Sequence, residues 1–293
     1  MNLIKAIVKE IRVNHWIKNI LIFSPLFFSR QLLHFEFYPS LALWFIAFSV
    51  IASAVYVIND LFDVEKDRKH PKKKFRPIAS WTISKTMAYI MIWVLTITWF
   101  SIAFFTNIWF FALLLAYFIS NLIYSINVKH IAVLDILFIS IMYFMRVLGW
   151  ALIIDVKISS YIFITIFFWA MFLISAKRYA ELIWDSTEKR KVLEFYNEKV
   201  LESIFLLSMA VALVSYIMYT VSQGWIYFYS IVFVVYVFIK YVYLVFWEWK
   251  GEEPEMILVK DKATFVSIML WLVFSMYFYY NEQIHLILKN NLL

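Results

Sequence analysis

Three aspartates stand three and then four residues apart in the segment Asn59-Asp60-Leu61-Phe62-Asp63-Val64-Glu65-Lys66-Asp67. On a helix, positions i, i+3 and i+7 share one face, so Asp60, Asp63 and Asp67 would lie within an arc of roughly 60°, with Asn59 on its flank. Carboxylates this close repel one another unless a cation lies between them. Mg²⁺ prefers oxygen ligands and is usually held by one or two carboxylates together with substrate phosphates. The segment therefore predicts a magnesium site with Asn59, Asp60, Asp63 and Asp67 as ligands; the alternative is a solvated helix end with paired surface charges.

A basic segment, His70-Pro71-Lys72-Lys73-Lys74-Phe75-Arg76-Pro77, follows directly. It has two interpretations: an anchor on anionic lipid head groups, or a clamp for phosphate beside the metal. For the lysines, Lys73 included, both interpretations remain open. For Arg76 we favour the clamp, because a guanidinium can contact a phosphate through two hydrogen bonds.

A second segment, Lys177-Arg178-x-x-Glu181-x-x-x-Asp185, repeats the spacing of the first. Arg178, Glu181 and Asp185 again share one helical face. Two basic residues replace the Asn-Asp pair, so this half is better suited to phosphate than to a second full metal site. The alternative is an ordinary amphipathic extension of a helix.

The elements that must position these residues are membrane helices. The 293-residue chain is 64% hydrophobic, well above the roughly 45–50% apolar content of soluble domains. A helix needs about 20 apolar residues to cross a bilayer. The sequence predicts an all-α integral membrane protein that forms a single domain over residues 1–293. Its nine predicted spans are residues 19–35, 39–58, 83–105, 107–126, 131–154, 160–176, 201–220, 225–246 and 263–280.

The basic residues predict the orientation of these spans. Most of the 27 lysines and arginines fall on the side of the N-terminus, and only Arg30, Lys157 and Lys289 fall in the opposite loops. By the positive-inside rule, the N-terminus and the three long polar loops (59–82, 177–200 and 247–262) are cytoplasmic and the C-terminus is outside. We expect a multi-pass protein of the cell inner (cytoplasmic) membrane, and we attribute the net charge of +7 to these loops rather than to nucleic-acid binding.

Composition also excludes several kinds of site. The chain has no cysteine, which excludes disulfides, thiolate nucleophiles and thiolate metal sites. It has only three glycines, too few for a glycine-rich phosphate loop.

Two charges, Asp135 and Arg146, fall within the fifth predicted span. Charges inside a membrane are costly and commonly line a cavity or pair with one another. We expect Arg146 to line a cavity and Asp135 to have either a structural or a catalytic role.

The first motif resembles the NDxxDxxxD motif of the UbiA superfamily of membrane prenyltransferases. Lys177-Arg178-Tyr179-Ala180-Glu181-Leu182 replaces the usual second acidic motif and is similar to the KRxxEL sequence of the decaprenyl-phosphate phosphoribosyltransferase branch. Arg12-x-x-x-Trp16-x-Lys18-Asn19, Phe75-Arg76-Pro77 and Gly251-Glu252-Glu253-Pro254 agree with this resemblance. Val13 departs from it, since a proline is common there, and Asp185 is not part of the branch motif.

The resemblance implies nine transmembrane helices around a central cavity that opens to the cytoplasm and laterally to lipid. It implies Mg²⁺ as the cofactor, phosphoribosyl diphosphate and a polyprenyl phosphate as substrates, and transfer of 5-phosphoribose with release of diphosphate. The catalytic residues would be Asp60, Asp63, Lys177, Arg178 and Glu181. The substrate-binding residues would be Lys18, Lys73, Arg76, Tyr124, Arg146 and Asp185.

Three alternatives remain open: prenyl transfer from a diphosphate to an aromatic acceptor, transport through charged cytoplasmic gates, and lipid binding without catalysis. A second acidic DxxxD motif would favour the first, and the chain lacks it. Transport would place charge in several spans, whereas charge within the spans is sparse here.

Overall fold

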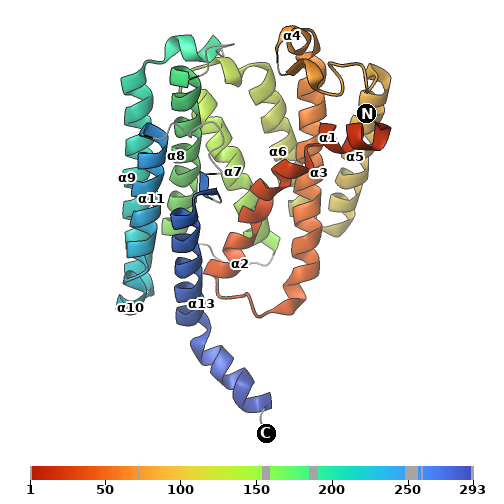
Figure 1. The fold of residues 1–293 in the computed structure, drawn as a ribbon. Coiled ribbons are helices and arrows are strands. Elements are labelled where there is room, and N and C mark those ends of the chain that lie inside the picture. The colour runs from red at the N-terminus through yellow and green to blue at the C-terminus, as the bar shows by residue number, and fades with distance from the viewer. Residues whose placement is uncertain are drawn as a thin grey trace. The chain divides into compact units, whose positions relative to one another are not determined.

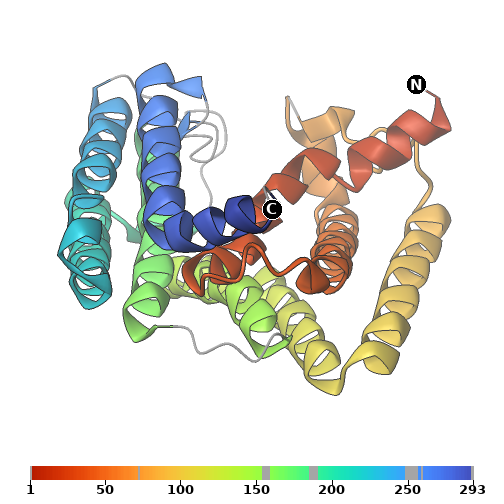
Figure 2. The same ribbon diagram turned by 90° about the horizontal axis from the view of Figure 1, so that it is seen from below.

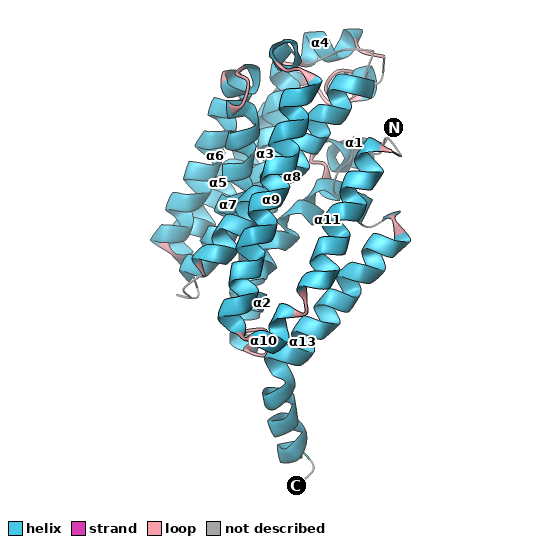
Figure 3. Cartoon of the chain, turned by 90° about the vertical axis from the view of Figure 1, so that its left-hand side faces the viewer, coloured by secondary structure: helices cyan, strands magenta, loops and turns pink. Residues whose placement is uncertain are grey.

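The structure is a computed structural model that describes residues 2–71, 73–153, 159–184, 191–247, 257–258 and 260–291. Every regular element among these residues is helical, which confirms the all-α prediction for the described chain (Figure 3). Seven helical segments are long and apolar enough to cross a membrane, so the chain is a multi-pass membrane protein. They are Phe35–Phe62, Lys85–Thr106, Ile108–Ile126, Ser160–Ile183, Glu198–Gln223, Trp225–Phe246 and Lys262–Asn281.

The chain divides into two compact units, which we describe separately. The N-terminal unit comprises Met1–Lys129 and Met145–Lys157. Its helices are α1 (Leu3–Glu10), η1 (Val13–Phe23), α2 (Ser24–Phe28), η2 (Phe35–Phe37), α3 (Tyr38–Phe62), α4 (Val64–Lys69), η3 (Lys73–Phe75), α5 (Lys85–Thr106) and α6 (Ile108–Ile126). Helix α3 is central to this unit: it packs against η1, α5 and α6, and it carries α4 at one end (Figure 1).

The C-terminal unit comprises His130–Phe144 and Ile158–Leu293. Its helices are α8 (Ser160–Trp184), η5 (Lys191–Phe195), α9 (Glu198–Gln223), α10 (Trp225–Phe228), α11 (Ile231–Phe246) and α13 (Lys262–Asn291). Helix α8 packs along α9, and α11 lies beside α13, which are both blue in Figure 2. Helix α7 (Leu134–Ile153) belongs to both units, because its first half falls in the C-terminal unit and its second half in the N-terminal unit; the short η4 (Val128–His130) precedes it.

Two of the nine predicted spans are not among the seven. Residues 131–154 contain α7, a 20-residue helix that carries Asp135 and Arg146. Residues 19–35 do not form one helix. The 3₁₀ helix η1 ends at Phe23, and α2 begins at Ser24 with Pro25 in its first turn. Because a 3₁₀ helix rises about 2.0 Å per residue, the 11 residues of η1 and the five of α2 together cover roughly 30 Å, close to the thickness of a bilayer core. The nine-span topology and the central cavity stay predictions.

An apolar core joins α1, α4 and α5 to the end of α3 and supports the polar residues there. Its fully buried members are Ala6, Val57, Val64, Ile78, Ile83 and Ala88. Hydrogen bonds fix η1 to α3 as well: the indole of Trp16 donates to Ser53 over 3.0 Å, and the amide of Asn19 donates to Ser49 over 2.9 Å. The start of the chain is thereby held against the helix that carries the first acidic motif.

Helix α7 approaches α3 closely at Gly149. The indole of Trp44 is fully buried there and lies 4.0 Å, centroid to centroid, from the ring of Phe110. A β-carbon at Gly149 would stand 1.7 Å from a ring carbon of Trp44 and 2.6 Å from Leu113. Only glycine allows this packing without a shift of the neighbouring side chains or of the helices.

The Gly149→Ala variant should therefore lose stability, by about 1–3 kcal/mol, the usual cost of overpacking a close-packed core. The measurement is the thermal unfolding midpoint of the detergent-solubilised protein. Ile141→Ala on the same helix, where the residue is 42% exposed, is the control and should change the midpoint much less. An equal midpoint for Gly149→Ala and wild type would contradict the close contact with Trp44.

Candidate active site

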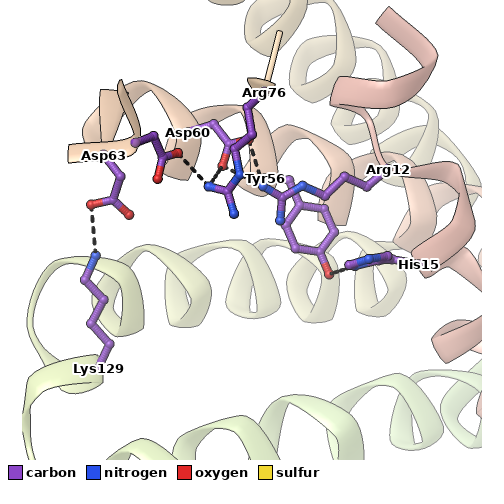
Figure 4. Close-up of polar contacts among 8 residues, drawn as sticks. Arg12, His15, Tyr56, Asp60, Asp63, Arg76 and Lys129 are labelled. Atoms are coloured by element: carbon purple, nitrogen blue, oxygen red, sulfur yellow. Dashed lines mark hydrogen bonds and ion pairs between the residues drawn. The ribbon is translucent and has the colours of Figure 1, made fainter. Parts of the chain in front are cut away.

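Asp60 is the centre of the polar residues at the end of α3. Its side chain is 4% exposed. The guanidinium of Arg12 donates from Nη2 to both carboxylate oxygens, over 2.6 and 2.7 Å. Arg76 donates from Nη1 to Oδ1 of the same carboxylate over 2.9 Å (Figure 4). The buried negative charge is thus matched by two cations from distant parts of the chain, as buried charges require.

Arg76 also joins Asp60 to Asp67. The same Nη1 donates to Oδ2 of Asp67 over 2.6 Å. We call Arg12, Asp60, Asp67 and Arg76 the first polar cluster. Burial raises the pKa of Asp67 above its ordinary value, although Arg76 acts in the opposite direction. The contact confirms the predicted shared face for Asp60 and Asp67. The role of Arg76 as a phosphate clamp stays a prediction.

Asp63 departs from that face. Helix α3 ends at Phe62, Asp63 adopts a non-helical conformation (φ −93°, ψ 8°), and α4 begins at the next residue. The Asp63 side chain is 41% exposed and its nearest cation is Lys129, with 3.8 Å between Nζ and Oδ1 (Figure 4). The backbone N–H of Asp67 still donates to the carbonyl of Asp63, so the helical phase continues across the interruption and Asp67 returns to the face of Asp60.

Arg12 is held in an unusual conformation. Its φ of +52° lies in the left-handed region, which is sparsely populated by residues other than glycine. The guanidinium lies 4.7 Å from the centroid of the Tyr56 ring, and Tyr56 in turn contacts His15 over 3.4 Å. The two bonds to Asp60 and the ring contact hold this conformation at the point where α1 passes into η1.

Glu10 is the residue of this site that the sequence analysis missed. It is 1% exposed, no N–H or hydroxyl group of the described residues donates to its carboxylate oxygens, and its side chain lies within hydrogen-bonding reach of the Asp60 carboxylate. Burial and the neighbouring Asp60 carboxylate raise the pKa of Glu10 to about 8, with Arg12 acting in the opposite direction. Burial and the Asp60 charge thus favour the protonated form of Glu10. A glutamate followed two residues later by an arginine gives no signal of this in the sequence.

The donor set at this end of α3 is suited to a hard cation. Within the described residues, no three acidic or histidine side chains converge as a preformed metal site. The Oδ1 atom of Asn59, however, is buried without a hydrogen-bond partner. Unpartnered buried oxygens beside carboxylates have the chemistry that Mg²⁺ prefers, so the residues fit the predicted metal.

The raised pKa of Glu10 predicts a pH dependence of stability. A carboxyl whose folded pKa lies above its unfolded value stabilises the fold at low pH and loses this contribution as pH rises through the folded pKa. Without divalent cations, wild type should therefore lose stability relative to Glu10→Gln between about pH 4.5 and pH 8. The loss should amount to a few kcal/mol, since one pKa unit corresponds to about 1.4 kcal/mol.

Thermal midpoints of both proteins, measured from pH 5 to pH 9 in EDTA, test this expectation. Glu65→Gln, at a side chain that is 72% exposed, should follow the wild-type profile. Parallel profiles for wild type and Glu10→Gln would contradict the protonated, buried state of Glu10.

The KRxxEL segment forms a second polar cluster in the C-terminal unit. Arg178 is 2% exposed and donates from Nε to Oδ2 of Asp135 over 2.7 Å and from Nη1 to Oε2 of Glu181 over 2.7 Å. The Tyr196 hydroxyl donates to the other oxygen of Asp135 over 2.7 Å and accepts from the backbone N–H of Val133. We define the second polar cluster as Asp135, Arg178, Glu181 and Tyr196.

This geometry confirms that Arg178 and Glu181 share a face and gives Asp135 its partner. Asp135 is fully buried, and burial together with the bond to Asp135 raises the pKa of Tyr196, so its hydroxyl remains a donor. Two carboxylates engage Arg178. The charge of Glu181, whose side chain is 16% exposed, is thereby held next to a fixed guanidinium. Sequence reasoning missed Tyr196, which lies 61 residues from Asp135.

Loss of the Asp135 charge should destabilise the protein, because Arg178 would keep a buried positive charge with one partner fewer. We expect Asp135→Asn to cost about 3 kcal/mol, at the low end for a broken buried ion pair because Glu181 remains. Tyr196→Phe should cost about 1 kcal/mol, the usual net contribution of one hydrogen bond. Chemical or thermal unfolding of the solubilised protein measures both. Glu194→Gln, at an exposed residue of η5, is the control, and an Asp135→Asn variant as stable as this control would contradict the buried pair.

The other predicted site residues lie outside these two clusters. Arg146 is buried and donates to the Tyr117 hydroxyl over 2.8 Å. The positive charge of Lys73 acts to lower the pKa of Asp67. Tyr124 and Lys177 are half-buried. The side chain of Lys18 and all of Asp185 lie outside the described residues, and the substrate-binding roles of all these residues stay predictions.

The chain matches the UbiA prenyltransferase family over residues 22–266. It is 32% identical over 222 residues to the decaprenyl-phosphate phosphoribosyltransferase of Mycobacterium tuberculosis, which covers 73% of this chain and 74% of the relative. It is 31% identical over 229 residues to the enzyme of the same name from Mycolicibacterium smegmatis, covering 76% of this chain and 72% of the relative.

Solved structures of the same family share the fold. A UbiA homolog from Archaeoglobus fulgidus bound to GPP and Mg²⁺ superposes with a TM-score of 0.70 at 17% identity, covering 94% of this chain and 99% of that one. A UbiA homolog from Aeropyrum pernix K1 gives a TM-score of 0.65 at 15% identity, covering 88% of this chain and 98% of that one. At these identities the likeness is one of fold.

Proposed function

Because the chain belongs to the UbiA prenyltransferase family, we propose that this membrane transferase moves 5-phosphoribose from phosphoribosyl diphosphate to a polyprenyl phosphate and releases diphosphate. The names of its relatives at 31–32% identity support the choice of substrates. The proposed unit of function is the whole chain as a single domain. We place it in the inner membrane with its polar loops in the cytoplasm, where a water-soluble donor is available.

The observation that carries the proposal is the composition of the second polar cluster. A buried arginine, held by Asp135 and Glu181 over 2.7 Å each, lies where a second acidic motif would supply carboxylates for metal. In this cluster a fixed guanidinium lies between two carboxylates, and Lys177 adds a second positive charge beside it in the sequence. Because both carboxylates are already engaged by Arg178, such a set is less suited to a second metal ion than a pair of free carboxylates would be.

The first polar cluster would receive the diphosphate of the donor. Asp60 and Asp67, with Asn59 and the nearby Asp63, would hold Mg²⁺, which when bound neutralises charge on a diphosphate leaving group. Arg12 and Arg76 each use a single terminal nitrogen in their bonds to these carboxylates. A guanidinium has five N–H donors, so both arginines keep N–H groups that would contact phosphate oxygens.

The proposed transfer balances without a redox partner or a strong base. An oxygen of the lipid phosphate, already an anion, forms the new bond to C1 of the ribose. The bond from C1 to the diphosphate oxygen breaks, and diphosphate leaves with the electron pair. C1 carries oxocarbenium character on the way, as glycosyl centres do, and the product is a lipid-linked phosphoribose phosphodiester.

The test is an assay of the purified protein in neutral-lipid vesicles with labelled phosphoribosyl diphosphate, a polyprenyl phosphate and Mg²⁺. Wild type should form a lipid-linked label, and EDTA should abolish it. Asp60→Asn should lower kcat/KM by about 100-fold or more, comparable with the loss of one preorganised electrostatic contact. Glu65→Gln, on α4 with a 72% exposed side chain, should keep the wild-type rate.

Prenyl diphosphate and an aromatic acceptor, offered in parallel, represent the alternative within the family. Product from that pair, with no lipid-linked label from phosphoribosyl diphosphate, would overturn the proposal in favour of prenyl transfer. Lipid binding that is independent of Mg²⁺, with no product from either pair, would overturn it in favour of a non-catalytic lipid-binding protein.

A further inference from the structure

A groove of about 430 Å³ runs along the first residues of the chain, where α1 passes into η1. This volume falls within the range of small-molecule sites, about 300–1,000 Å³. The groove belongs to the N-terminal unit alone. Its lining residues are Ile4, Lys5, Val8, Lys9, Arg12, Val13, Asn14 and His15.

The two edges of the groove differ in chemistry. Lys5 and Lys9 are four residues apart on α1 and share one face. Ile4 and Val8, one position earlier in each turn, form the neighbouring face and are 68% and 49% exposed. A basic edge therefore runs beside an apolar edge, which is the arrangement that an amphiphile with an anionic head group requires.

The inner end of the groove reaches the first polar cluster. Arg12 lines the groove and donates both of its short bonds to Asp60. His15, the last lining residue, contacts Tyr56, whose ring lies beside the Arg12 guanidinium (Figure 4). A phosphate that enters between Lys5 and Lys9 would thus meet Arg12 next, and Arg12 is in direct contact with the candidate metal ligand.

We propose that this groove is the docking site for the phosphate monoester of a prenyl lipid, with Lys5 and Lys9 on the phosphate and Ile4, Val8 and Val13 along the first isoprene units. The identification of this lipid as the acceptor rests on the proposed function. Lys5 and Lys9 act as binding residues that deliver the phosphate toward Arg12.

The chemistry of the groove distinguishes between the possible phosphate ligands. The phosphoribosyl donor has no apolar part, so it would leave the faces of Ile4 and Val8 without a partner. A bulk phospholipid head group could bind Lys5 and Lys9 at the surface, but it would make no use of the continuation to Arg12 and His15. A lipid phosphate with a thin prenyl chain uses both the apolar edge and the inner end.

The experiment measures binding of farnesyl phosphate to the full-length protein in detergent, in the absence of donor. Lys5→Gln/Lys9→Gln should weaken binding roughly tenfold, the effect expected for loss of a charge-assisted hydrogen bond. Lys66→Gln/Lys69→Gln removes the same charge from exposed positions of α4 and should leave binding unchanged. Ile4→Ser/Val8→Ser, at exposed residues, should weaken binding of farnesyl phosphate but not of inorganic phosphate.

Equal weakening by the two lysine double variants would overturn the proposal, because it would show a general charge effect. So would a Lys5→Gln/Lys9→Gln effect that appears only in vesicles with phosphatidylglycerol, since the lysines would then bind the bilayer. Lys5→Gln alone provides a check, because Lys9 also donates to the carbonyl of Phe75 over 3.0 Å and its loss could disturb that contact. Weaker binding of farnesyl phosphate by Lys5→Gln alone supports the docking site. Unchanged binding by Lys5→Gln contradicts it.

The binding readout separates this proposal from the proposed function. Binding of farnesyl phosphate by wild type that depends on Lys5 and Lys9, without formation of lipid-linked phosphoribose, would support the docking site and contradict the proposed reaction. If wild type forms the product, and Lys5→Gln/Lys9→Gln raises the KM for polyprenyl phosphate but not the KM for the donor, both the docking site and the proposed reaction are supported. Product formation with no effect of the double variant on that KM would overturn the groove alone.

Discussion

The carboxylate of Asp60 organises the N-terminal unit. It is almost completely buried, and two guanidinium groups reach it from residues 12 and 76, which lie 48 and 16 positions away in the sequence. A buried carboxylate without such partners would be strongly unfavourable, so the pairing ties the start of the chain and the segment after α4 to the end of α3. The left-handed backbone at Arg12, the raised pKa of Glu10 and the inner end of the groove beside α1 all depend on where this one side chain lies.

The two polar clusters are built on opposite charge patterns. In the first cluster, two arginines surround Asp60, and one of them extends to Asp67. In the second, two carboxylates surround a single arginine. In the proposed function, a metal ion would replace the arginines on Asp60 and Asp67, and the arginines would turn to phosphate oxygens. In the second cluster both carboxylates are engaged by the fixed guanidinium of Arg178, which leaves neither of them free for a metal ion. This contrast shows that the two clusters are not chemically equivalent.

Local sequence patterns predicted the parts of the site that depend on helical phase. Asp60 and Asp67 could be placed together because the backbone hydrogen bonds continue across Asp63, and Arg178 and Glu181 because they lie within one helix. Asp63 could not be placed, since the interruption after Phe62 turns its side chain toward Lys129. The pairing of Arg12 with Asp60, and of Asp135 with Arg178 and Tyr196, also escaped prediction, because the partners lie more than 40 residues apart. Apolar runs gave seven of the membrane helices, but hydropathy does not distinguish the 3₁₀ winding of Val13–Phe23 from an α-helix.

A structure of the protein with phosphoribosyl diphosphate and Mn²⁺, in which the metal is located by its anomalous scattering, would test the proposed donor site most directly. We expect Mn²⁺ beside the Asp60 carboxylate, with at least one of Arg12 and Arg76 moved from Asp60 onto phosphate oxygens. Mn²⁺ bound at Asp135 and Glu181, or a donor bound elsewhere while both arginines remain on Asp60, would contradict it.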